Sequence, residues 1–356
     1  MSSSKRGLTI RSSRDRFAAA ELFCKLSQRR GRKALRLNSG VEQNTRKMIT
    51  KGRNHIMERR NYRHYLTSIF LICLAVTVWV LQAKAAEPQK LIGEQISMIE
   101  KRHGGRLGIA ALNTATGMRI EYRPAERFAM CSTFKFILVA AVLKQVDEKK
   151  VSLDRGIPYT TADLLDWAPI TKKHVSDGAM TVERLCAAAI EYSDNTAANL
   201  LLDLLGGPKA VTAYARSLGD SVTRLDRNEP SLNDNLPNDD RDTTSPSSMV
   251  ETMNKVLSGH ALSPSSRKIL ENYLLANTTG ANRLRAGIPL DWRVGDKTGT
   301  GSNGAVNDIA VMWPPDRSPI FVAVYYSGSP SPNSDREAVL AEVGKLIAIE
   351  FNKRSH

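Results

Sequence analysis

The sequence has few cysteines and few histidines, and this argues against two kinds of site. Only four cysteines occur in 356 residues, and after residue 86 only Cys131 and Cys186 remain. The four histidines in that part of the chain are scattered without metal-ligand spacing. We therefore predict no metal, and no cofactor is expected. Cys131 and Cys186 could pair, but we expect them to be buried free thiols.

Net positive charge is also absent from most of the chain, although the whole carries +15. Residues 1–86 hold 19 lysines and arginines against 4 acidic residues, and 19 − 4 accounts for the entire +15. The remaining 32 basic and 32 acidic residues cancel over 87–356. Phosphate binding needs a concentrated positive surface, so we predict no nucleic-acid partner for the body of the protein.

No apolar run is as long as the roughly 20 residues that a membrane-spanning helix needs. The longest, Leu66–Leu81, follows a short basic stretch and ends at Ala83-Lys84-Ala85, a small-x-small pattern of signal peptidase sites. We predict a signal peptide over 57–85, cleaved near Ala85, and an exported, periplasmic protein whose only membrane contact is this signal. A retained membrane anchor is the alternative.

Residues 1–56 show no apolar periodicity and are rich in Ser, Arg and Lys. They are either a disordered basic extension or a stretch upstream of the true start at Met48 or Met57. Signal peptides seldom follow 56 polar residues, which favours the second interpretation.

Hydrophobic periodicity predicts strands at both ends of the body and helices between them. Strands are expected over 106–113, 118–123, 292–300, 307–313 and 320–327, and helices over 88–102, 134–143, 181–192, 195–205, 208–218, 247–258 and 335–351. The first helix is expected to place Leu91, Ile92, Ile96 and Ile99 on one face. The predicted fold is α/β (α+β): an antiparallel sheet of about five strands with flanking helices, plus an inserted helical region. The sheet region comprises 86–123 and 277–356, and the helical region 124–276.

One segment of the helical region, 226–246, does not fit regular structure. Its only large apolar residues are Leu232 and Leu236, and it contains three prolines. A long loop inside a compact domain is usually functional or a linker. Since patterned sequence flanks it on both sides, we predict a functional loop.

Four short motifs occur in a fixed order along the body, and none is specific alone. A Ser-Asp-Asn between two helices is an ordinary capping sequence, and a loop glutamate is usually solvated. Together they supply a nucleophile, two amines, a shuttle hydroxyl and a carboxylate, which is a complete set for acyl transfer through a serine. The motifs are Ser132-Thr-Phe-Lys135, Ser193-Asp-Asn195, Glu229-Pro-Ser-Leu-Asn233 and Lys297-Thr-Gly299.

The first motif carries the strongest chemical signal. Ser132 is expected to open the apolar helix, with Lys135 one turn deeper on the same face. The apolar neighbours of Lys135 leave little wet surface for its amine, and a buried ammonium is unfavourable without a partner. We therefore expect Lys135 to be paired or partly neutral.

With these motifs the chain resembles the class A serine β-lactamases over about 88–352, and the Glu229 motif is specific to that class. The resemblance implies hydrolysis of the β-lactam amide of penicillins and cephalosporins through a serine acyl-enzyme, and so β-lactam resistance, by a monomer. Ser132 would be acylated, with its own N–H and that of Thr300 as oxyanion hole. Lys135 and Glu229 are alternative bases for acylation, and Ser193 a proton relay.

The resemblance also implies a set of binding residues. Glu229 and Asn233 would hold the hydrolytic water, Lys297, Thr298 and Thr300 the substrate carboxylate, and Arg283 a second carboxylate contact. The full set expected at the substrate is Asn195, Asn233, Lys297, Thr298, Gly299, Thr300, Trp167 and Arg283. An Arg227–Asp242 ion pair and a cis Glu229–Pro230 peptide are further expectations.

Two departures and two alternatives accompany the resemblance. Cys186 lacks the partner that many members supply, and Gly301 replaces the cysteine that some carbapenem-hydrolysing members link to Cys131. A penicillin-binding D,D-peptidase shares the serine, lysine and Lys-Thr-Gly elements but lacks the Glu229 loop. An uncleaved Leu66–Leu81 segment would favour a membrane-anchored β-lactam sensor, whereas the Glu229-to-Asn233 motif argues against one.

Overall fold

A computed structural model describes residues 42–53, 70–71, 74 and 91–353. The chain divides into two units, Met1–Lys84 and Ala85–His356. The predicted signal peptide and its cleavage site fall almost wholly outside the described residues. In the part that is described, no helix is both long enough and apolar enough to cross a membrane. The second unit contains all four motifs.

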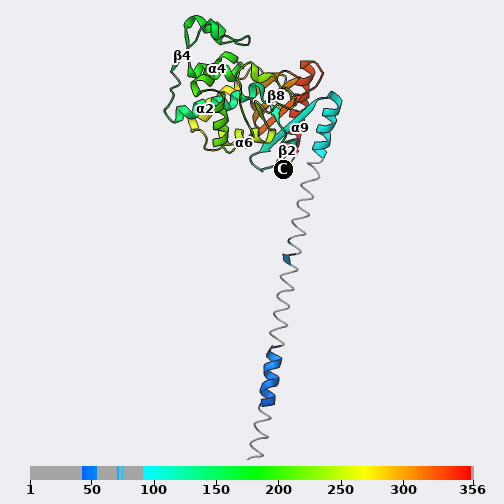
Figure 1. Cartoon of the computed structure of the whole chain (residues 1–356). Helices are drawn as coiled ribbons and strands as arrows, with labels where there is room; N and C mark the ends of the chain where they lie inside the picture. The colour runs from blue at the N-terminus through cyan, green and yellow to red at the C-terminus, as the bar shows by residue number, and fades with distance from the viewer. Residues whose placement is uncertain (1–41, 54–69, 72–73, 75–90, 354–356) are drawn as a thin grey trace, which may run out of the picture. The chain divides into compact units, whose positions relative to one another are not determined.

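A five-stranded antiparallel sheet is the centre of the second unit, with the strand order β2-β1-β9-β8-β7. It pairs strands from the two ends of this unit, as predicted (Figure 1). The strands are β1 (Arg106–Asn113), β2 (Arg119–Tyr122), β7 (Arg293–Gly301), β8 (Ala305–Trp313) and β9 (Ile320–Ser327). Two short pairs lie outside this sheet: β3 (Phe128–Ala129) with β6 (Thr243–Thr244), and β4 (Gly156–Pro158) with β5 (Ala179–Thr181).

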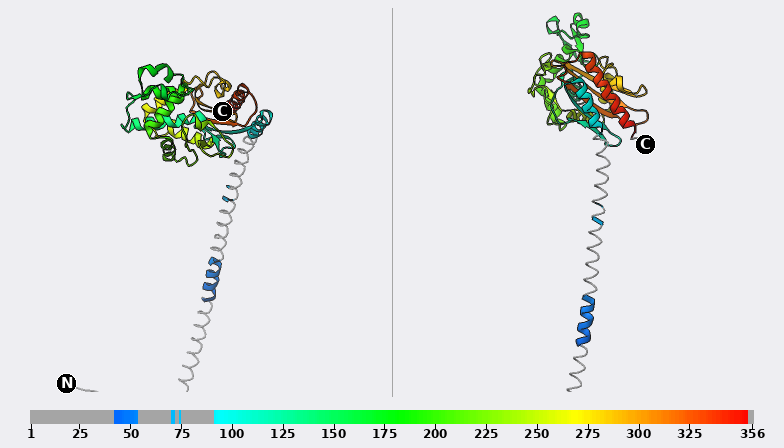
Figure 2. Two further views of the ribbon diagram at one scale, coloured as in Figure 1. Left: turned by 45° about the horizontal axis from the view of Figure 1, so that its top comes forward. Right: turned by 90° about the vertical axis from the view of Figure 1, so that its right-hand side faces the viewer.

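One face of the sheet is covered by the helix at 91–103, α8 (Leu284–Gly287) and α9 (Asn333–Lys353) (Figure 2). Ile92, Ile96 and Ile99 of the first helix are buried, but Leu91 is 58% exposed. The expectation that Leu91 shares their face was wrong. Successive helical residues are rotated by about 100°, so Leu91 lies outside the stripe centred on Ile92 and Ile96.

The other face carries the helical region, which is built around α2 (Phe134–Asp147). Residues 134–143 of α2 are all buried, as the apolar sequence predicted. This region contains five more α-helices after α2, of which four lie within one residue of their predicted ends and α7 was not predicted individually. They are α3 (Val182–Glu191), α4 (Asn195–Leu205), α5 (Pro208–Ser217), α6 (Pro246–Leu257) and α7 (Pro264–Leu275).

Candidate active site

Ser132 lies in a short 3₁₀ turn, η1 (Cys131–Thr133), that leads directly into α2. It therefore precedes the helix that it was expected to open. The preceding residue, Cys131, has a φ of +46°, a strained backbone conformation of the kind that clusters at functional sites. Strand β7 passes close to this turn, because a Cβ added at Gly299 would lie 2.7 Å from the Met130 carbonyl oxygen.

Lys135 is fully buried, and polar groups surround its amine. Its Nζ lies 3.1 Å from Ser132 Oγ, 3.0 Å from Glu229 Oε1 and 2.6 Å from Asn195 Oδ1. It also donates to the Ser193 carbonyl oxygen at 2.9 Å. Burial lowers the pKa of Lys135, and the Glu229 carboxylate opposes that shift. The expected paired lysine is confirmed.

Glu229 is brought to the serine by the short 3₁₀ helix η4 (Ser231–Asn233) in the 226–246 loop. Its carboxylate is buried and accepts from Ser132 Oγ at 3.3 Å on Oε1 and from Asn233 Nδ2 at 2.5 Å on Oε2. The side chain of Asn199 clamps the backbone of Glu229: it donates to the carbonyl at 2.9 Å and accepts from the N–H at 3.0 Å. Both backbone and side chain of Glu229 are thus fixed.

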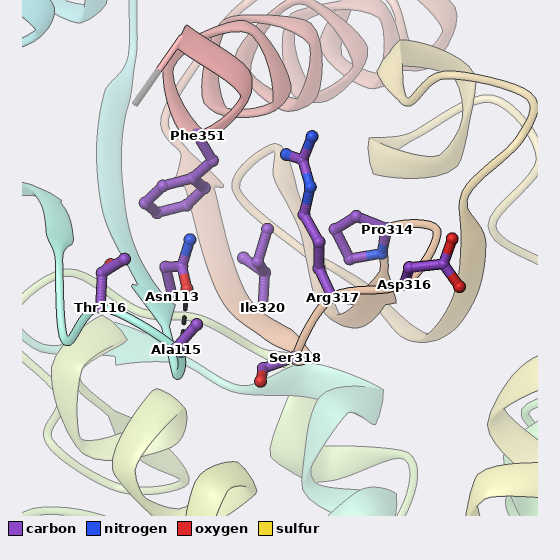
Figure 3. A pocket seen from close by; sticks show the side chains of 9 residues that line it. All are labelled: Asn113, Ala115, Thr116, Pro314, Asp316, Arg317, Ser318, Ile320 and Phe351. Carbon is purple, nitrogen blue, oxygen red and sulfur yellow. Dashed lines mark hydrogen bonds between the residues drawn. The ribbon is translucent and has the colours of Figure 1, made fainter. Parts of the chain in front are cut away.

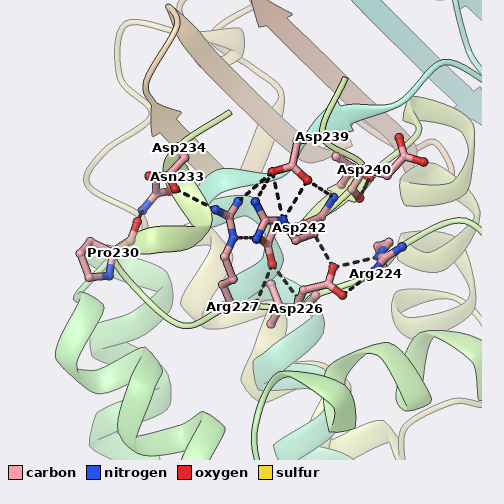
Figure 4. A network of polar contacts seen from close by, with 12 residues as sticks. Arg224, Asp226, Arg227, Pro230, Asn233, Asp234, Asp239, Asp240 and Asp242 are labelled. Carbon is pink, nitrogen blue, oxygen red and sulfur yellow. Dashed lines mark hydrogen bonds and ion pairs between the residues drawn. The ribbon is translucent and has the colours of Figure 1, made fainter. Parts of the chain in front are cut away.

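The ends of the 226–246 loop are joined by the network shown in Figure 4. Arg227 Nε donates to the fully buried Asp242 at 2.6 Å, and its Nη1 reaches Asp234 at 2.7 Å. Asp242 Oδ1 also accepts from the backbone N–H groups of Asp226 and Arg227. The predicted Arg227–Asp242 pair and the cis Glu229–Pro230 peptide are both confirmed.

Ser193 and Asn195 face the amine of Lys135 from the turn between α3 and α4. Asp194 serves as the N-cap of α4, accepting from the N–H of Ala197 at 2.8 Å. The capping role thus belongs to Asp194 alone, which leaves Ser193 and Asn195 for the site. Ser193 has a φ of +56°, a second strained residue next to the nucleophile.

Lys297 and Thr298 lie on β7 on the other side of Ser193. The Lys297 amine donates to Ser193 Oγ at 3.0 Å and is fully buried. Burial and the nearby Lys135 amine lower the pKa of Lys297 well below its usual value. The Thr298 hydroxyl is 2.5 Å from that of Thr279. The Ser193 hydroxyl therefore lies between the amines of Lys135 and Lys297, both of which have lowered pKa values. This arrangement is suited to proton relay.

Arg283 lies behind Thr300 and is only 4% exposed. Its guanidinium donates to Thr300 Oγ1 at 2.7 Å and to the Gly299 carbonyl at 2.9 Å. Glu337 of α9 accepts from Arg283 Nε at 3.1 Å and from Nη2 at 3.0 Å. The direct contact of Arg283 with a substrate carboxylate stays a prediction, whereas its support of Thr300 is evident.

Trp167 is 56% exposed and stands next to the Ser193 turn. Its indole N–H donates to the Tyr192 carbonyl at 3.1 Å, and its own carbonyl accepts from Asn195 N–H at 2.9 Å. The ring is therefore held at the edge of the site with much of its surface open. Such a position suits contact with the body of a bound molecule.

Several residues of the site were not anticipated, because nothing local in the sequence distinguishes them. Asn199 and Glu337 act through partners 30 and 54 residues away. Asp296 is buried beside Lys297 and bonds Arg285 and Asn277. Burial and the Asp296 charge raise the pKa of Asp308 well above its usual value. The position of Asp308 depends on the sheet register, which pairs it with Thr298, whereas Asn199 and Glu337 reach their partners from helices α4 and α9.

Cys131 and Cys186 are buried free thiols, as expected. Burial raises the pKa of the Cys131 thiol to about 12, so it is a poor nucleophile despite its position beside Ser132. A Cβ at Gly301 would lie 2.6 Å from the Cys131 sulfur. A side chain at Gly301 would therefore require the Cys131 sulfur or its surroundings to move.

Two of the cavities that lie outside the motif cluster in the described residues border the ends of helices. Figure 3 shows one of about 300 Å³ between the β1–β2 turn, the β8–β9 turn and the end of α9, with Phe351 and Arg317 in its wall. A second, of about 450 Å³, lies among α2, α4 and α5. Neither is lined by a motif residue. Within the described residues, no group of His, Cys, Asp or Glu is arranged to hold a metal ion.

Comparison with known proteins relates this geometry to one family. The family model "Beta-lactamase enzyme family" matches residues 91–351. The chain is 46% identical to β-lactamase OXY-2 of Klebsiella oxytoca, over 77% of this chain and 95% of that protein. It is 45% identical to β-lactamase CTX-M-97 of Escherichia coli, over 81% and 98%.

Solved structures agree with these relatives. An ancestral class A β-lactamase (GNCA) is 60% identical and superposes with a TM-score of 0.72, over 73% of this chain and 100% of that one. The class A protein PenP from Rhodopseudomonas palustris is 50% identical with a TM-score of 0.72, over 73% and 99%. The predicted fold class is thereby confirmed.

Proposed function

This chain belongs to the class A serine β-lactamases, and on that premise we propose that it hydrolyses β-lactams by acylating Ser132 and freeing the product with water activated by Glu229. The observation that carries this proposal is the triangle of Ser132 Oγ, Lys135 Nζ and Glu229 Oε1. Its three sides measure 3.1, 3.0 and 3.3 Å. A nucleophile with two possible bases in hydrogen-bond reach is the arrangement that activates a serine.

Acylation begins when Ser132 Oγ attacks the lactam carbonyl carbon. Its proton passes to Glu229 or to neutral Lys135; the contacts support both, and the lowered pKa of Lys135 favours a neutral fraction of that amine. The N–H groups of Ser132 and Thr300 stabilise the oxyanion. Ser193, between the amines of Lys135 and Lys297, delivers a proton to the lactam nitrogen as the C–N bond breaks.

Deacylation requires a water molecule positioned to attack the carbonyl carbon of the acyl-enzyme ester. Asn233 Nδ2 and Glu229 Oε2 are in contact, so a water between the carboxylate, the amide and the ester carbon would be oriented by both. Glu229 takes its proton and the hydroxide adds to the acyl carbon. As the ester C–O bond breaks, Glu229 returns the proton to Ser132 Oγ, which it contacts, and Ser132 leaves as the alcohol. Asn199 fixes Glu229 for this step through two backbone bonds.

Substrate binding is assigned to the remaining motif residues. Lys297, Thr298 and Thr300 present an amine and two hydroxyls to the substrate carboxylate, with Arg283 supporting Thr300 from behind. Gly299 lets β7 approach the serine turn closely. Asn195 meets the side-chain amide of the substrate, and the exposed ring of Trp167 packs on its body.

The protein is further proposed to be an exported, periplasmic monomer without nucleic-acid partners, cut near Ala85. The zero net charge of 87–356 and the small-x-small sequence at Ala83–Ala85 support this. N-terminal sequencing of the exported protein should begin at Ala86.

The activity is tested with purified residues 86–356 and a chromogenic cephalosporin. We expect steady turnover, and for Ser132→Ala no turnover and no covalent adduct by mass spectrometry. A parallel assay with a D-Ala-D-Ala peptide separates the alternatives: peptide cleavage with only stoichiometric cephalosporin opening would indicate a D,D-peptidase. Stoichiometric opening without peptide cleavage would indicate a sensor.

A further inference from the structure

The turn that carries Ser132 is strained, so its shape depends on the contacts around it. Cys131, with its φ of +46°, lies immediately before Ser132, and a residue other than glycine keeps such a conformation only where its surroundings determine it. The contacts gather at the preceding residue, Met130, whose N–H donates to the Asp242 carbonyl at 2.9 Å. The Met130 carbonyl accepts from the N–H of Thr133 at 3.2 Å and from its hydroxyl at 2.8 Å. What fixes this turn also fixes the backbone N–H of Ser132.

Asn307 of β8 supplies a further contact to the same carbonyl. Its side-chain Nδ2 donates to the Met130 carbonyl at 3.2 Å and to the Ala129 carbonyl at 2.9 Å. Asn307 is only 1% exposed, and its Oδ1 accepts from the Tyr326 N–H at 3.3 Å. Because a backbone N–H must face the oxygen of the amide, the contact with Tyr326 directs Nδ2 to the two carbonyls. The Asn307 side chain therefore ties the serine turn to the sheet.

The backbone of Asn307 holds the strand on the other side of the site. Asn307 pairs with Gly299 in the β7–β8 register, next to Thr300. Arg283 Nη1 strengthens this pairing, because it donates to the carbonyl oxygens of Asn307 and Gly299 at 2.8 and 2.9 Å. Residues paired across a sheet face the same side. The missing side chain at Gly299 thus leaves room for the Asn307 amide at the Met130 carbonyl.

We propose that Asn307 is a positioning residue that sets the spacing of the oxyanion hole, an inference that rests on the proposed function. Its side chain holds the turn that bears the Ser132 N–H, and its backbone holds the strand that bears the Thr300 N–H. One buried residue thus joins the two segments whose N–H groups must converge on a single oxygen. Such donors act at about 2.7–3.1 Å from the oxyanion, so a shift of either segment would weaken stabilisation of the transition state.

Asn307→Asp tests this role with a side chain of the same shape. A carboxylate donates no hydrogen bond and a carboxylic acid only one, so the two bonds to the turn cannot both be kept, whereas an acceptor for the Tyr326 N–H remains. Stopped-flow kinetics with a chromogenic cephalosporin should show acylation and deacylation each slowed about 10–100-fold, the order of effect of a 1 Å misplacement. The dissociation constant of the noncovalent complex should change little. Asn307→Ala, which donates nothing, should behave in the same way.

Infrared spectroscopy gives a readout that a loss of stability alone would not change. In a Glu229→Gln background, a cephalosporin with an isotopic label at its lactam carbonyl reports the ester carbonyl of the acyl-enzyme, whose stretching frequency is lowered by hydrogen bonds from the oxyanion hole. We expect this band at higher frequency in Asn307→Asp and Asn307→Ala. Ser266→Ala is the control, because it removes a buried hydrogen bond of 2.6 Å to Asp147. It should leave the band and both rates as in the parent.

The outcomes separate the role of Asn307 from the proposed function. A parent acylated on Ser132, with an unchanged band and unchanged acylation in both Asn307 variants, would overturn the inference alone. A band shift of equal size in Ser266→Ala would also overturn it, since the effect would then follow stability. Absence of any adduct on Ser132 while Asn307 is intact would overturn the proposed function, and the inference with it.

Discussion

At the residue scale, the chemistry depends on ionisable side chains whose pKa values are shifted by burial. Lys135 and Lys297 are both fully buried, and the pKa of each is lowered. Neither amine could act at neutral pH as a proton acceptor if it were exposed, because a free lysine is then almost entirely protonated. Burial of Lys135 at the start of α2 and of Lys297 in the middle of β7 is therefore part of the catalytic apparatus.

Asn199 offers a test of how closely Glu229 must be held. Asn199→Ala removes both backbone bonds to Glu229 and should slow deacylation about 10–100-fold, because misplacement of a base by about 1 Å has an effect of this order. Acylation should change much less. Single-turnover kinetics separate the two steps. Asn272→Ala, on the exposed side of α7, is the control; equal slowing of both steps in Asn199→Ala would contradict a specific positioning role.

At the scale of elements, the approach of β7 to the serine turn depends on Gly299. A Cβ there would lie 2.7 Å from the Met130 carbonyl oxygen, whereas a Cβ at Gly156 would meet only Ala179 at 3.9 Å. Gly299→Ala should lower the free energy of unfolding by about 1–3 kcal/mol, the usual effect of overpacking, and should reduce kcat/KM. Gly156→Ala should change neither. Urea unfolding and steady-state kinetics give both quantities; an unchanged Gly299→Ala enzyme would be inconsistent with the close contact.

The 226–246 loop should open in acid before the rest of the molecule. Hydrogen bonds from Arg241 lower the pKa of Asp239 to about 2, from the usual 3.8. Because the folded pKa is depressed, the contribution of Asp239 to stability is fully present above about pH 4 and is lost as the pH falls towards 2. Hydrogen exchange of loop amides between pH 5 and 2 should show this weakening.

Arg241→Gln is the matched variant for the loop. It removes the largest cause of the Asp239 shift, so the folded pKa returns towards its ordinary value and the acid-dependent loss of protection becomes smaller. The same pH profile in parent and variant would show that the Arg241–Asp239 pair does not govern loop opening.

The elements also show how far the sequence could predict the structure. Period-2 patterning located the five long strands, and the apolar run located buried α2, because these signals are local. The short strands β3 to β6 and the helix α7 escaped individual prediction: a two- or three-residue strand has no periodicity, and the first half of α7 is polar. The motif residues could be predicted from their spacing, but Asn199, Glu337 and Asp308 could not, since their roles arise only from long-range contacts.

At the scale of the whole molecule, charge and catalysis are confined to different parts of the chain. All four motifs lie in 87–356, where acidic and basic residues balance, while the net charge of +15 lies in 1–86. We expect residues 86–356 to match the full chain in kcat and to show no salt-dependent binding to duplex DNA. Fluorescence anisotropy at two salt concentrations measures this binding. Tight, salt-sensitive binding by residues 86–356 would contradict the separation.

The central claim is that Glu229 makes the acylated serine a temporary intermediate. The direct test is stopped-flow mixing of Glu229→Gln with a chromogenic cephalosporin, with Asp240→Asn, an exposed carboxylate of the same loop, as control. Loss of a positioned general base should slow turnover about 10²–10⁴-fold, giving a stoichiometric burst, a stall, and an acyl adduct on Ser132 by mass spectrometry. Steady parental turnover by Glu229→Gln, without an accumulating adduct, would contradict the account.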